Sequence, residues 1–444
     1  MAANPDYPSL AALHRNFIWG VSTSSFQVEG ATREDGRGQS VWDTRCQLGK
    51  IANGDTGDIA CDHYHRYPED IALMQRLGVQ AYRFSVAWPR VLPQGRGAAN
   101  ESGLAFYDRL IDALLAANIE PWLCLYHWDM PQALDDLGGW TNRESVAWFA
   151  DYAALAARRY GGRVRRFATF NEPSIFTLFG QGFGKESDTS DDLRRRAIHH
   201  VNLAHGAAVD AIRTHAPGSL IGCIHNYQPC LPSTPADKDA AALADAYWNR
   251  VFPDPQHLGA YPQLLRAAME AHIQSGDMER ICRPLDWFGL NHYGPNYIKT
   301  DAGARFGFGF GDKPAGTALT PIGWATDSDA FRDTLLIVSK DYRLPVYVTE
   351  NGIGASEKLD AGGAVIDKVR INYLRDHIGA MNAAAAAGAD VRGYFVWSLL
   401  DNFEWDSGYN VRFGIVYMDY PTLRRIPKAS FEWYRGLIKA ARAR

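Results

Sequence analysis

The chain has 444 residues, of which 46% are hydrophobic, and its formal net charge is −4. This charge balance gives no reason to expect a nucleic acid or an anionic membrane surface as a partner. The six cysteines are scattered without a C-x-x-C pair, which argues against a zinc site and a disulfide framework. No stretch approaches the ~18 uninterrupted apolar residues of a membrane span, and residues 1–17 lack the basic and apolar regions of a secretory signal. We therefore expect a cytoplasmic protein, with a secreted form whose signal has been removed as the alternative.

Short β-rich runs alternate with helical patterns along the whole chain. The predicted strands are residues 17–23, 80–86, 121–128, 165–171, 219–226, 286–293, 345–351 and 393–399. Helical patterns lie between them, for example at 68–77, 103–117 and 383–387, and the glycine-rich residues 303–316 are predicted to be a long loop. Alternation of near-continuous apolar strands with helices is typical of a parallel sheet covered on both faces. Eight such units predict a single α/β domain, a (β/α)8 barrel over residues 1–444, because barrels reach this length through loop insertions.

Polar or aromatic side chains stand at or near the ends of nearly all predicted strands. In chain order they are Gln27, Arg83, His127 with Trp128, Asn171 with Glu172, His225 with Asn226, Asn291 with Tyr293, Glu350 and Trp397. Any one of them alone is explained as a capped strand end or a satisfied polar group. Together they indicate an active site, because the sites of such barrels lie at the carboxyl ends of the strands.

Two of these side chains are carboxylates, Glu172 after the fourth strand and Glu350 in the seventh. Glycoside hydrolysis needs such a pair, in which one group protonates the leaving oxygen while the other attacks the anomeric carbon or directs attack on it. A separation of about 5–5.5 Å between the carboxyl groups leads to retention of configuration. A structural glutamate paired with an arginine, for which Arg83 is a candidate, is the alternative for either residue.

Several segments in this order resemble those of glycoside hydrolase family one, the β-glucosidase family, over nearly the whole chain. They are FIWGVSTSSFQVEGA (17–31), YRFSVAWPRVLPQGRG (82–97), TFNEP (169–173), NRVFPDPQHLGAYP (249–262), VYVTENGIG (346–354), WSLLDNFEW (397–405) and GYNVRFG (408–414). The resemblance implies a TIM barrel that needs neither metal nor cofactor. It also implies a retaining exo-β-glycosidase with a small-molecule β-glycoside as substrate, most readily a β-glucoside and also a β-fucoside or β-galactoside.

The resemblance also assigns roles to residues. Glu350 is implied to be the nucleophile and Glu172 the acid/base. Asn171 is implied to bind the sugar 2-hydroxyl, Tyr293 to orient the nucleophile, and Arg83 to hold the nucleophile ionised. The implied substrate-binding residues are Gln27, His127, Trp128, Asn171, Asn291, Tyr293, Trp324, Trp397, Glu404 and Trp405.

The loops that shape the leaving-group side depart from the family pattern at residues 183–192 and 325–328, so the aglycone preference stays open, as does the oligomeric state. A 6-phospho-β-glycosidase is the nearest alternative function. Glu404 argues against it, because no Lys or Arg between 402 and 411 could offset a phosphate there. A catalytically silent, carbohydrate-binding barrel is a second alternative, and the intact pair of glutamates argues against it. The histidines at 63–65 and 199–200 are interpreted as structural, while Glu29 is as readily structural as functional.

Overall fold

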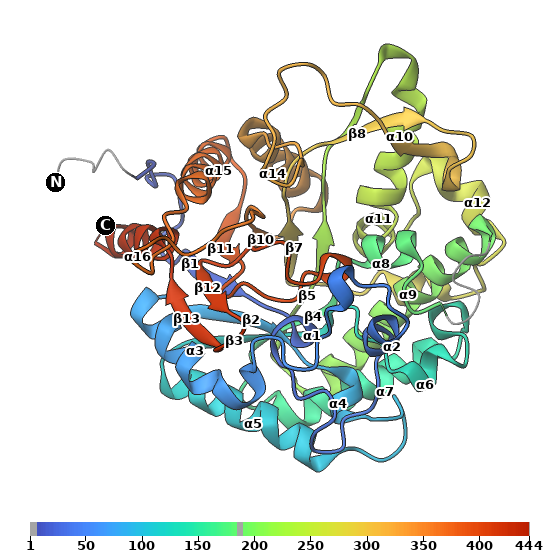
Figure 1. Ribbon diagram of the computed structural model, residues 1–444. Coiled ribbons are helices and arrows are strands. Elements are labelled where there is room, and N and C mark those ends of the chain that lie inside the picture. The colour runs from blue at the N-terminus through green and yellow to red at the C-terminus, as the bar shows by residue number, and fades with distance from the viewer. Residues whose placement is uncertain (1–6, 184–189, 444) are drawn as a thin grey trace.

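The computed structural model describes residues 7–183 and 190–443. Eight parallel strands close into a barrel in the order β1-β11-β10-β7-β5-β4-β3-β2, and helices surround it (Figure 1). The barrel strands are β1 (Ile18–Ser22), β2 (Ala81–Ser85), β3 (Glu120–Tyr126), β4 (Arg166–Asn171), β5 (Leu220–Asn226), β7 (Trp287–Asn291), β10 (Val346–Asn351) and β11 (Val391–Trp397). The first and last residues of each strand differ from those of a predicted strand by at most two positions, so the (β/α)8 fold is confirmed. The expectation that residues 1–444 form one domain stays a prediction.

The long helices lie on the outer face of the barrel (Figure 1). They are α3 (His63–Leu77), α5 (Glu101–Ala116), α7 (Ser145–Tyr160), α9 (Asp191–His215), α14 (Ser328–Tyr342), α15 (Lys368–Ala386) and α16 (Ala429–Arg442). Shorter helices occupy the loops: α1 (Ser25–Val28), α2 (Val41–Gln47), α4 (Trp88–Val91), α6 (Gln132–Asp135), α8 (Pro173–Phe179), α10 (Lys238–Asp245), α11 (Pro253–Leu258), α12 (Arg266–Glu270) and α13 (Asp277–Ile281). In the part of the chain that the structure describes, no helix has the length and apolar character needed to cross a membrane.

Large aromatic rings fill the lower part of the barrel interior, below the strand ends that carry the polar side chains. Trp122 packs against Trp287, Tyr347 and Phe395 with ring centroids 4.9 to 5.3 Å apart. Glycine makes room for them, since a Cβ added to Gly20 would lie 2.3 Å from a ring carbon of Phe395. This packed floor leaves the carboxyl ends of the strands as the place where a cavity can form.

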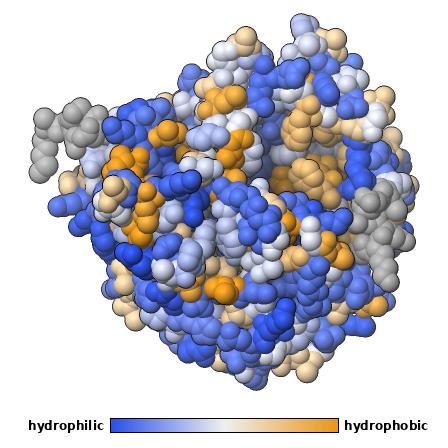
Figure 2. Space-filling view, in the orientation of Figure 1, coloured by the Kyte–Doolittle hydropathy of each residue, from blue (hydrophilic) through white to orange (hydrophobic). Residues whose placement is uncertain are grey.

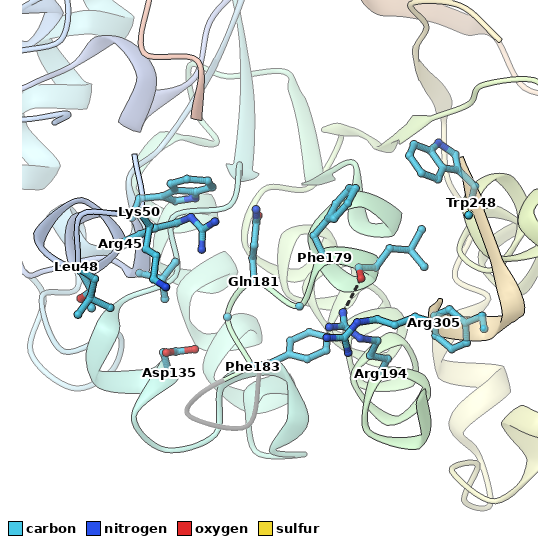
Figure 3. Close-up of a pocket in the computed structure, with 18 of the residues that line it drawn as sticks. Arg45, Leu48, Lys50, Asp135, Phe179, Gln181, Phe183, Arg194, Trp248 and Arg305 are labelled. Carbon is cyan, nitrogen blue, oxygen red and sulfur yellow. Dashed lines mark hydrogen bonds between the residues drawn. The ribbon is translucent and has the colours of Figure 1, made fainter. Parts of the chain in front are cut away.

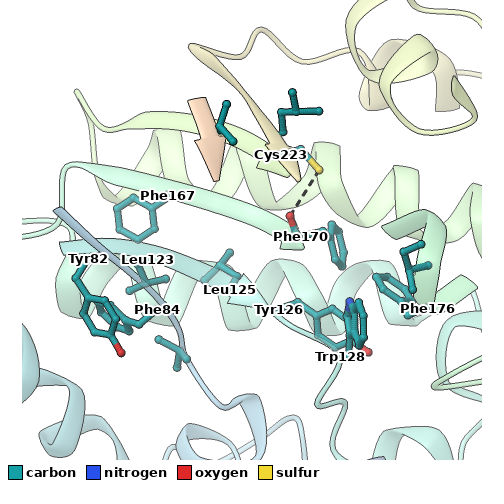
Figure 4. Packing of buried hydrophobic residues seen from close by; sticks show 14 of the residues in the cluster. Tyr82, Phe84, Leu123, Leu125, Tyr126, Trp128, Phe167, Phe170, Phe176 and Cys223 are labelled. Carbon is teal, nitrogen blue, oxygen red and sulfur yellow. Dashed lines mark hydrogen bonds between the residues drawn. The ribbon is translucent and has the colours of Figure 1, made fainter. Parts of the chain in front are cut away.

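A second layer of aromatic packing lies between the strands and the outer helices (Figure 4). Phe170 of β4 stacks on Phe149 of α7 with centroids 4.3 Å apart, and Tyr126 of β3 meets Phe176 of α8 edge to face at 5.0 Å. These contacts fix β3 and β4 against α7 and α8. The backbone of the polar residues that follow β3 and β4 in sequence is therefore held in a fixed position.

Two sequence expectations need correction. The helix predicted from Pro68 begins five residues earlier, at His63, and Pro68 lies inside it. The Tyr64 backbone N–H donates to the Glu29 carbonyl oxygen at 3.1 Å and the Tyr64 hydroxyl donates to Asp35, so tertiary contacts stabilise the turn before the proline. Within the same helix, His63 Nδ1 forms a buried hydrogen bond of 2.7 Å with Asp70. His63 is therefore structural, as expected, but it lies inside the helix and not before it.

The glycine-rich residues 303–316 are the second correction, because they are not entirely loop. They contain strand β9 (Phe308–Phe310), which pairs antiparallel with β8 (Asn296–Thr300), while β8 also pairs with β6 (Cys230–Pro232). This small sheet stands apart from the barrel strands, with β8 near the top of Figure 1. Of the loop segment 183–192, residues 184–189 lie outside the described residues.

Candidate active site

A cavity of about 470 Å³ opens at the carboxyl ends of the barrel strands. This face of the molecule is visibly hollowed right of its centre, where apolar side chains gather (Figure 2). The predicted site residues that line the cavity are His127, Trp128, Asn171, Glu172, Tyr293, Trp324, Glu350, Trp397, Glu404 and Trp405. The other three, Gln27, Arg83 and Asn291, are buried and contact lining residues by hydrogen bonds. The sequence therefore predicts a set of side chains that the fold brings together.

Glu350, in β10, has the surroundings of a carboxylate that is held ionised. Arg83 donates to its Oε1 at 2.7 Å, and the Tyr293 hydroxyl donates to its Oε2 at 2.6 Å. Burial raises the pKa of Glu350, and the positive charge of Arg83 and the Tyr293 hydrogen bond oppose that rise. Both carboxylate oxygens thus have a donor, and a cation balances the charge.

Arg83 also organises the neighbouring side chains. Its second terminal nitrogen lies 3.0 Å from His127 Nδ1 and 3.1 Å from Asn171 Oδ1, to which it donates. His127 Nε2 in turn lies 3.2 Å from the Asn171 amide nitrogen. Because the guanidinium is a fixed fork of donors, one buried residue sets the orientation of three polar groups at the cavity wall.

Glu172 follows β4 directly and is the N-cap residue of α8, which begins at Pro173. Its backbone takes a left-handed conformation with φ of 51°, which is strained for a residue that carries a Cβ. Its Oε1 accepts hydrogen bonds from the amides of Asn226 at 2.9 Å and Asn291 at 2.8 Å. Burial, followed by the charge of Glu350, raises the pKa of Glu172 to about 8.

The two glutamates therefore differ in charge state. Arg83 is ion-paired with Glu350 at 2.7 Å, whereas the hydrogen-bond donors to Glu172 are the neutral amides of Asn226 and Asn291. Near neutral pH the arrangement favours a proton on Glu172 beside an ionised Glu350, because two close anions disfavour each other. The pair can act as a proton donor and a nucleophile.

Glu404 lies in a loop that buried ion pairs hold in place. Asp401, buried at the start of the loop, forms ion pairs of 2.8 Å with both Arg412 and Lys428. Gln27 donates to Glu404 Oε2 at 3.4 Å and to the Phe403 carbonyl oxygen at 2.8 Å. Burial, with the charges of Glu350 and Glu172, raises the pKa of Glu404 to about 8.

Aromatic rings form the rest of the wall. His127 stacks on Trp397 with centroids 5.7 Å apart, and Trp128 packs on Trp405 at 4.6 Å. On the other side, Trp324 meets Tyr293 edge to face at 5.8 Å and is 46% exposed. Flat rings beside carboxylates and amides match a sugar, which has apolar faces and hydroxyl edges.

The lining residues that the sequence interpretation left without a role include Phe179, Asn226, Trp248 and Phe310. Asn226 is a polar residue at a predicted strand end, but nothing in the sequence indicates its hydrogen bond with Glu172. Trp248 and Phe310 lie in segments that come together only in the folded chain. The open question about Glu29 is answered by its contacts, since it pairs with Arg90 at 2.9 Å and accepts from Tyr107 at 2.6 Å, both buried; its role is structural.

A comparison with protein families matches residues 10–443 to the model of glycosyl hydrolase family 1. The chain belongs to glycosyl hydrolase family 1. Among curated relatives, Beta-glucosidase A of Thermotoga maritima is 40% identical over 435 residues, which cover 95% of this chain and 97% of that protein. Thermostable beta-glucosidase B of Thermobispora bispora is 44% identical, with 95% of this chain and 90% of that protein covered.

Solved structures of family 1 members agree with the barrel described above. The structure of a β-glucosidase from Thermotoga maritima in complex with glucoimidazole is 39% identical, with a TM-score of 0.91. The match covers 97% of this chain and 99% of that one. A bifunctional β-D-glucosidase/β-D-fucosidase of Bifidobacterium breve is 40% identical over 97% of this chain and 99% of its own length. The chain is thus a family 1 hydrolase along nearly its whole length.

Proposed function

We propose that this family 1 hydrolase is a retaining exo-β-glucosidase, which releases terminal β-D-glucosyl residues by double displacement. The observation that carries the proposal is the unequal environment of two buried carboxylates in one cavity. Arg83 balances the charge of Glu350, while burial beside Glu350 raises the pKa of Glu172 to about 8. The names of the relatives support glucose as the sugar, and the Bifidobacterium breve relative supports β-fucosides as further substrates. Cleavage of β-galactosides stays a prediction.

In the first half of the reaction, Glu350 attacks the anomeric carbon and forms a glycosyl ester. The bond from that carbon to the leaving oxygen breaks, and Glu172 gives its proton to this oxygen. Asn226 and Asn291 both donate to Oε1 of Glu172, which leaves Oε2 to carry the transferred proton. Tyr293 and Arg83 hold Glu350 in an ionised, fixed orientation until it attacks.

In the second half, a water molecule releases the sugar. Esterification removes the negative charge of Glu350, which is one of the causes of the raised pKa of Glu172. The pKa of Glu172 then falls, so the same residue changes from acid to base and takes a proton from the attacking water. Two successive inversions at the anomeric carbon give a product of the original β-configuration. Every step uses side chains of the protein, and none calls for a metal or cofactor.

Sugar binding is assigned to the side chains around the two glutamates. We assign the 2-hydroxyl to Asn171, whose contacts with Arg83 and His127 orient it beside Glu172. Glu404 and Gln27 take the hydroxyls farther from the anomeric carbon, and Trp397 and Trp405 form an apolar wall. The remaining members of the proposed binding set are His127, Trp128, Asn291, Tyr293 and Trp324.

The proposal is tested by steady-state hydrolysis of 4-nitrophenyl β-glucoside, with the α-glucoside as the stereochemical control. Release of nitrophenol from the β-anomer alone is expected, and wild-type protein that releases none would favour the silent, carbohydrate-binding alternative. The cytoplasmic location also stays a proposal. It is supported by the state of the cysteines, since all six are free thiols, as is usual in a reducing compartment.

A further inference from the structure

A second cavity, of about 710 Å³, opens beside the catalytic pocket (Figure 3). Phe179, Trp248 and Phe310 line both cavities, so the cavities adjoin at these three rings, which we call the passage. None of the three belongs to the side chains proposed to hold the sugar. The passage therefore starts on the leaving-group side of the catalytic pocket.

The passage is built of aromatic rings set nearly at right angles. Trp248 meets Phe179 at 6.5 Å with an interplanar angle of 89°, and Phe310 at 5.9 Å and 80°. Phe179 is 56% exposed and Phe310 57%, although both are large apolar side chains. Exposed aromatic surface at the mouth of a pocket is typical of a site that a ligand covers.

The chemistry of the passage differs from that of the sugar pocket. The sugar pocket places carboxylates and amides beside its rings, whereas the three shared residues of the passage carry no carboxylate, amide or hydroxyl. Charged groups surround the second cavity: Arg194 and Arg305 lie below Phe179 and Trp248 in Figure 3, and Arg45 and Lys50 lie on the opposite side. A flat apolar ring fits this passage better than a sugar ring, whose hydroxyls would lack partners among the three.

We propose that the passage and the second cavity bind the distal ring of an extended aromatic aglycone. The substrate class of the enzyme is then the β-glucosides of phenols that have two or more rings. This inference rests on the proposed β-glucosidase activity and specifies its leaving-group side.

The test compares phenyl β-glucoside with 4-phenylphenyl β-glucoside, whose phenols have similar acidity, so that the chemical step is matched. In Phe310→Ala, kcat/KM for the two-ring substrate is expected to fall about 10-fold more than for the one-ring substrate, as for a ring contact at an interface. The control is Leu258→Ala on α11, which removes a side chain of similar exposure, 56%, that lines neither cavity. This control should leave the ratio of the two substrates unchanged.

Three results would overturn the inference in distinguishable ways. An equal loss of kcat/KM on both substrates in Phe310→Ala would show that the passage does not contact the distal ring of the aglycone. A matching loss for cellotriose relative to cellobiose would show that it takes sugar rings and not aromatic ones. Wild-type protein that cleaves neither aryl glucoside would overturn the proposed function itself, and the passage with it.

A separate observation concerns the hydrogen bond made by Trp248. Its indole Nε1–H donates to Asn226 Oδ1 at 2.9 Å, and the Asn226 amide nitrogen donates to Glu172 Oε1 at 2.9 Å. The indole N–H is a donor only, so it turns the oxygen of the Asn226 amide toward Trp248 and the NH₂ toward Glu172. We infer that Trp248 is a positioning residue for Glu172, which it reaches through Asn226.

Trp248→Phe removes this donor and keeps an aromatic ring. Without the donor the Asn226 amide can turn its oxygen toward Glu172, so the carboxylate loses a hydrogen bond that favours its charged form. The pKa of Glu172 then rises. Because Glu172 must be protonated for the first step, the basic limb of the kcat/KM profile is expected to move to higher pH.

A double-mutant cycle separates this role from simple packing. Trp248→Phe should move the basic limb in the wild-type background and leave it unmoved in Asn226→Ala, because residues in one chain of hydrogen bonds do not act additively. Additive shifts, or a loss of rate at all pH values with the limb unmoved, would overturn the inference. Leu258→Ala again serves as the control, and the basic limb of its kcat/KM profile is expected to coincide with that of the wild type.

Discussion

Replacing Arg83 by methionine tests how the protein keeps its nucleophile ionised. Arg83 is 1% exposed, and its guanidinium lies 2.7 Å from Glu350. Methionine follows the aliphatic part of the side chain and removes the charge, so Glu350 keeps its hydrogen bonds with Tyr293 and Asn291 but loses the neighbouring cation. Burial already raises the pKa of Glu350, and the loss of the opposing cation should raise that pKa further.

The sign of the effect follows from the chemistry. Glu350 must be ionised to attack, so its pKa sets the acid limb of kcat/KM, and a higher pKa moves that limb to higher pH. On the acid side of the profile, kcat/KM should fall by about 10- to 10³-fold, the range expected when a carboxylate loses a directly paired cation. Breaking a buried ion pair also lowers the free energy of unfolding by about 3–5 kcal/mol near neutral pH. Because a raised folded pKa stabilises the protein as pH falls, part of this loss should be recovered at mildly acidic pH.

The assay is kcat/KM for 2,4-dinitrophenyl β-glucoside as a function of pH, since this good leaving group makes the proton from Glu172 unimportant. Arg90→Met is the matched control. Arg90 is also fully buried and pairs with Glu29 at 2.9 Å, but it does not line the catalytic pocket, so it should destabilise the fold and leave the acid limb in place. A folded Arg83→Met protein whose acid limb coincides with that of the wild type would refute the reasoning.

Three further predictions concern the catalytic and binding glutamates. Glu350→Gly should abolish turnover, because no other group can form the ester; added azide should restore cleavage of an activated glucoside and give the α-product, whereas a β-product would mean that the two roles are reversed. Glu172→Ala should spare dinitrophenyl glucosides and slow substrates with poor leaving groups by about 10²–10⁴-fold; equal losses on both would contradict the acid/base role. Wild-type protein should prefer 4-nitrophenyl β-glucoside to its 6-phosphate by at least ~10²-fold in kcat/KM, equivalent to about 2.7 kcal/mol, because the phosphate would replace a hydroxyl that Glu404 binds, and no Lys or Arg between residues 402 and 411 could pair with it. Comparable rates would show that Glu404 does not face O6 and would favour the phosphoglycosidase alternative.

The barrel could be predicted because its strands carry a strong local signal. Runs such as residues 80–86 and 345–351 are apolar and end in polar side chains, and the structure places β2 at Ala81–Ser85 and β10 at Val346–Asn351. The polar strand ends also predicted which side chains would meet, since in a parallel barrel all carboxyl ends lie at one face. Ten of the thirteen predicted site residues line the cavity, and Arg83, Asn291 and Gln27 are bonded to lining residues.

Features that depend on contacts between distant segments could not be predicted in this way. The first turn of α3 depends on the contacts of Tyr64 with Glu29 and Asp35, and β9 exists because β8 lies beside it. Neither dependence is visible in local periodicity. The hydrogen bond from Trp248 to Asn226 joins a π-helical turn (Ala246–Arg250) to a strand end 22 residues away, and only the folded chain shows it.

The central claim is that Glu350 and Glu172 carry out a double displacement. Proton NMR of the first product released by wild-type protein from 4-nitrophenyl β-glucoside tests this claim most directly, if spectra are recorded before mutarotation mixes the anomers. Two inversions at the anomeric carbon predict that β-glucose appears first and α-glucose accumulates only later. Appearance of α-glucose as the first product would mean a single displacement by water and would contradict the proposed mechanism.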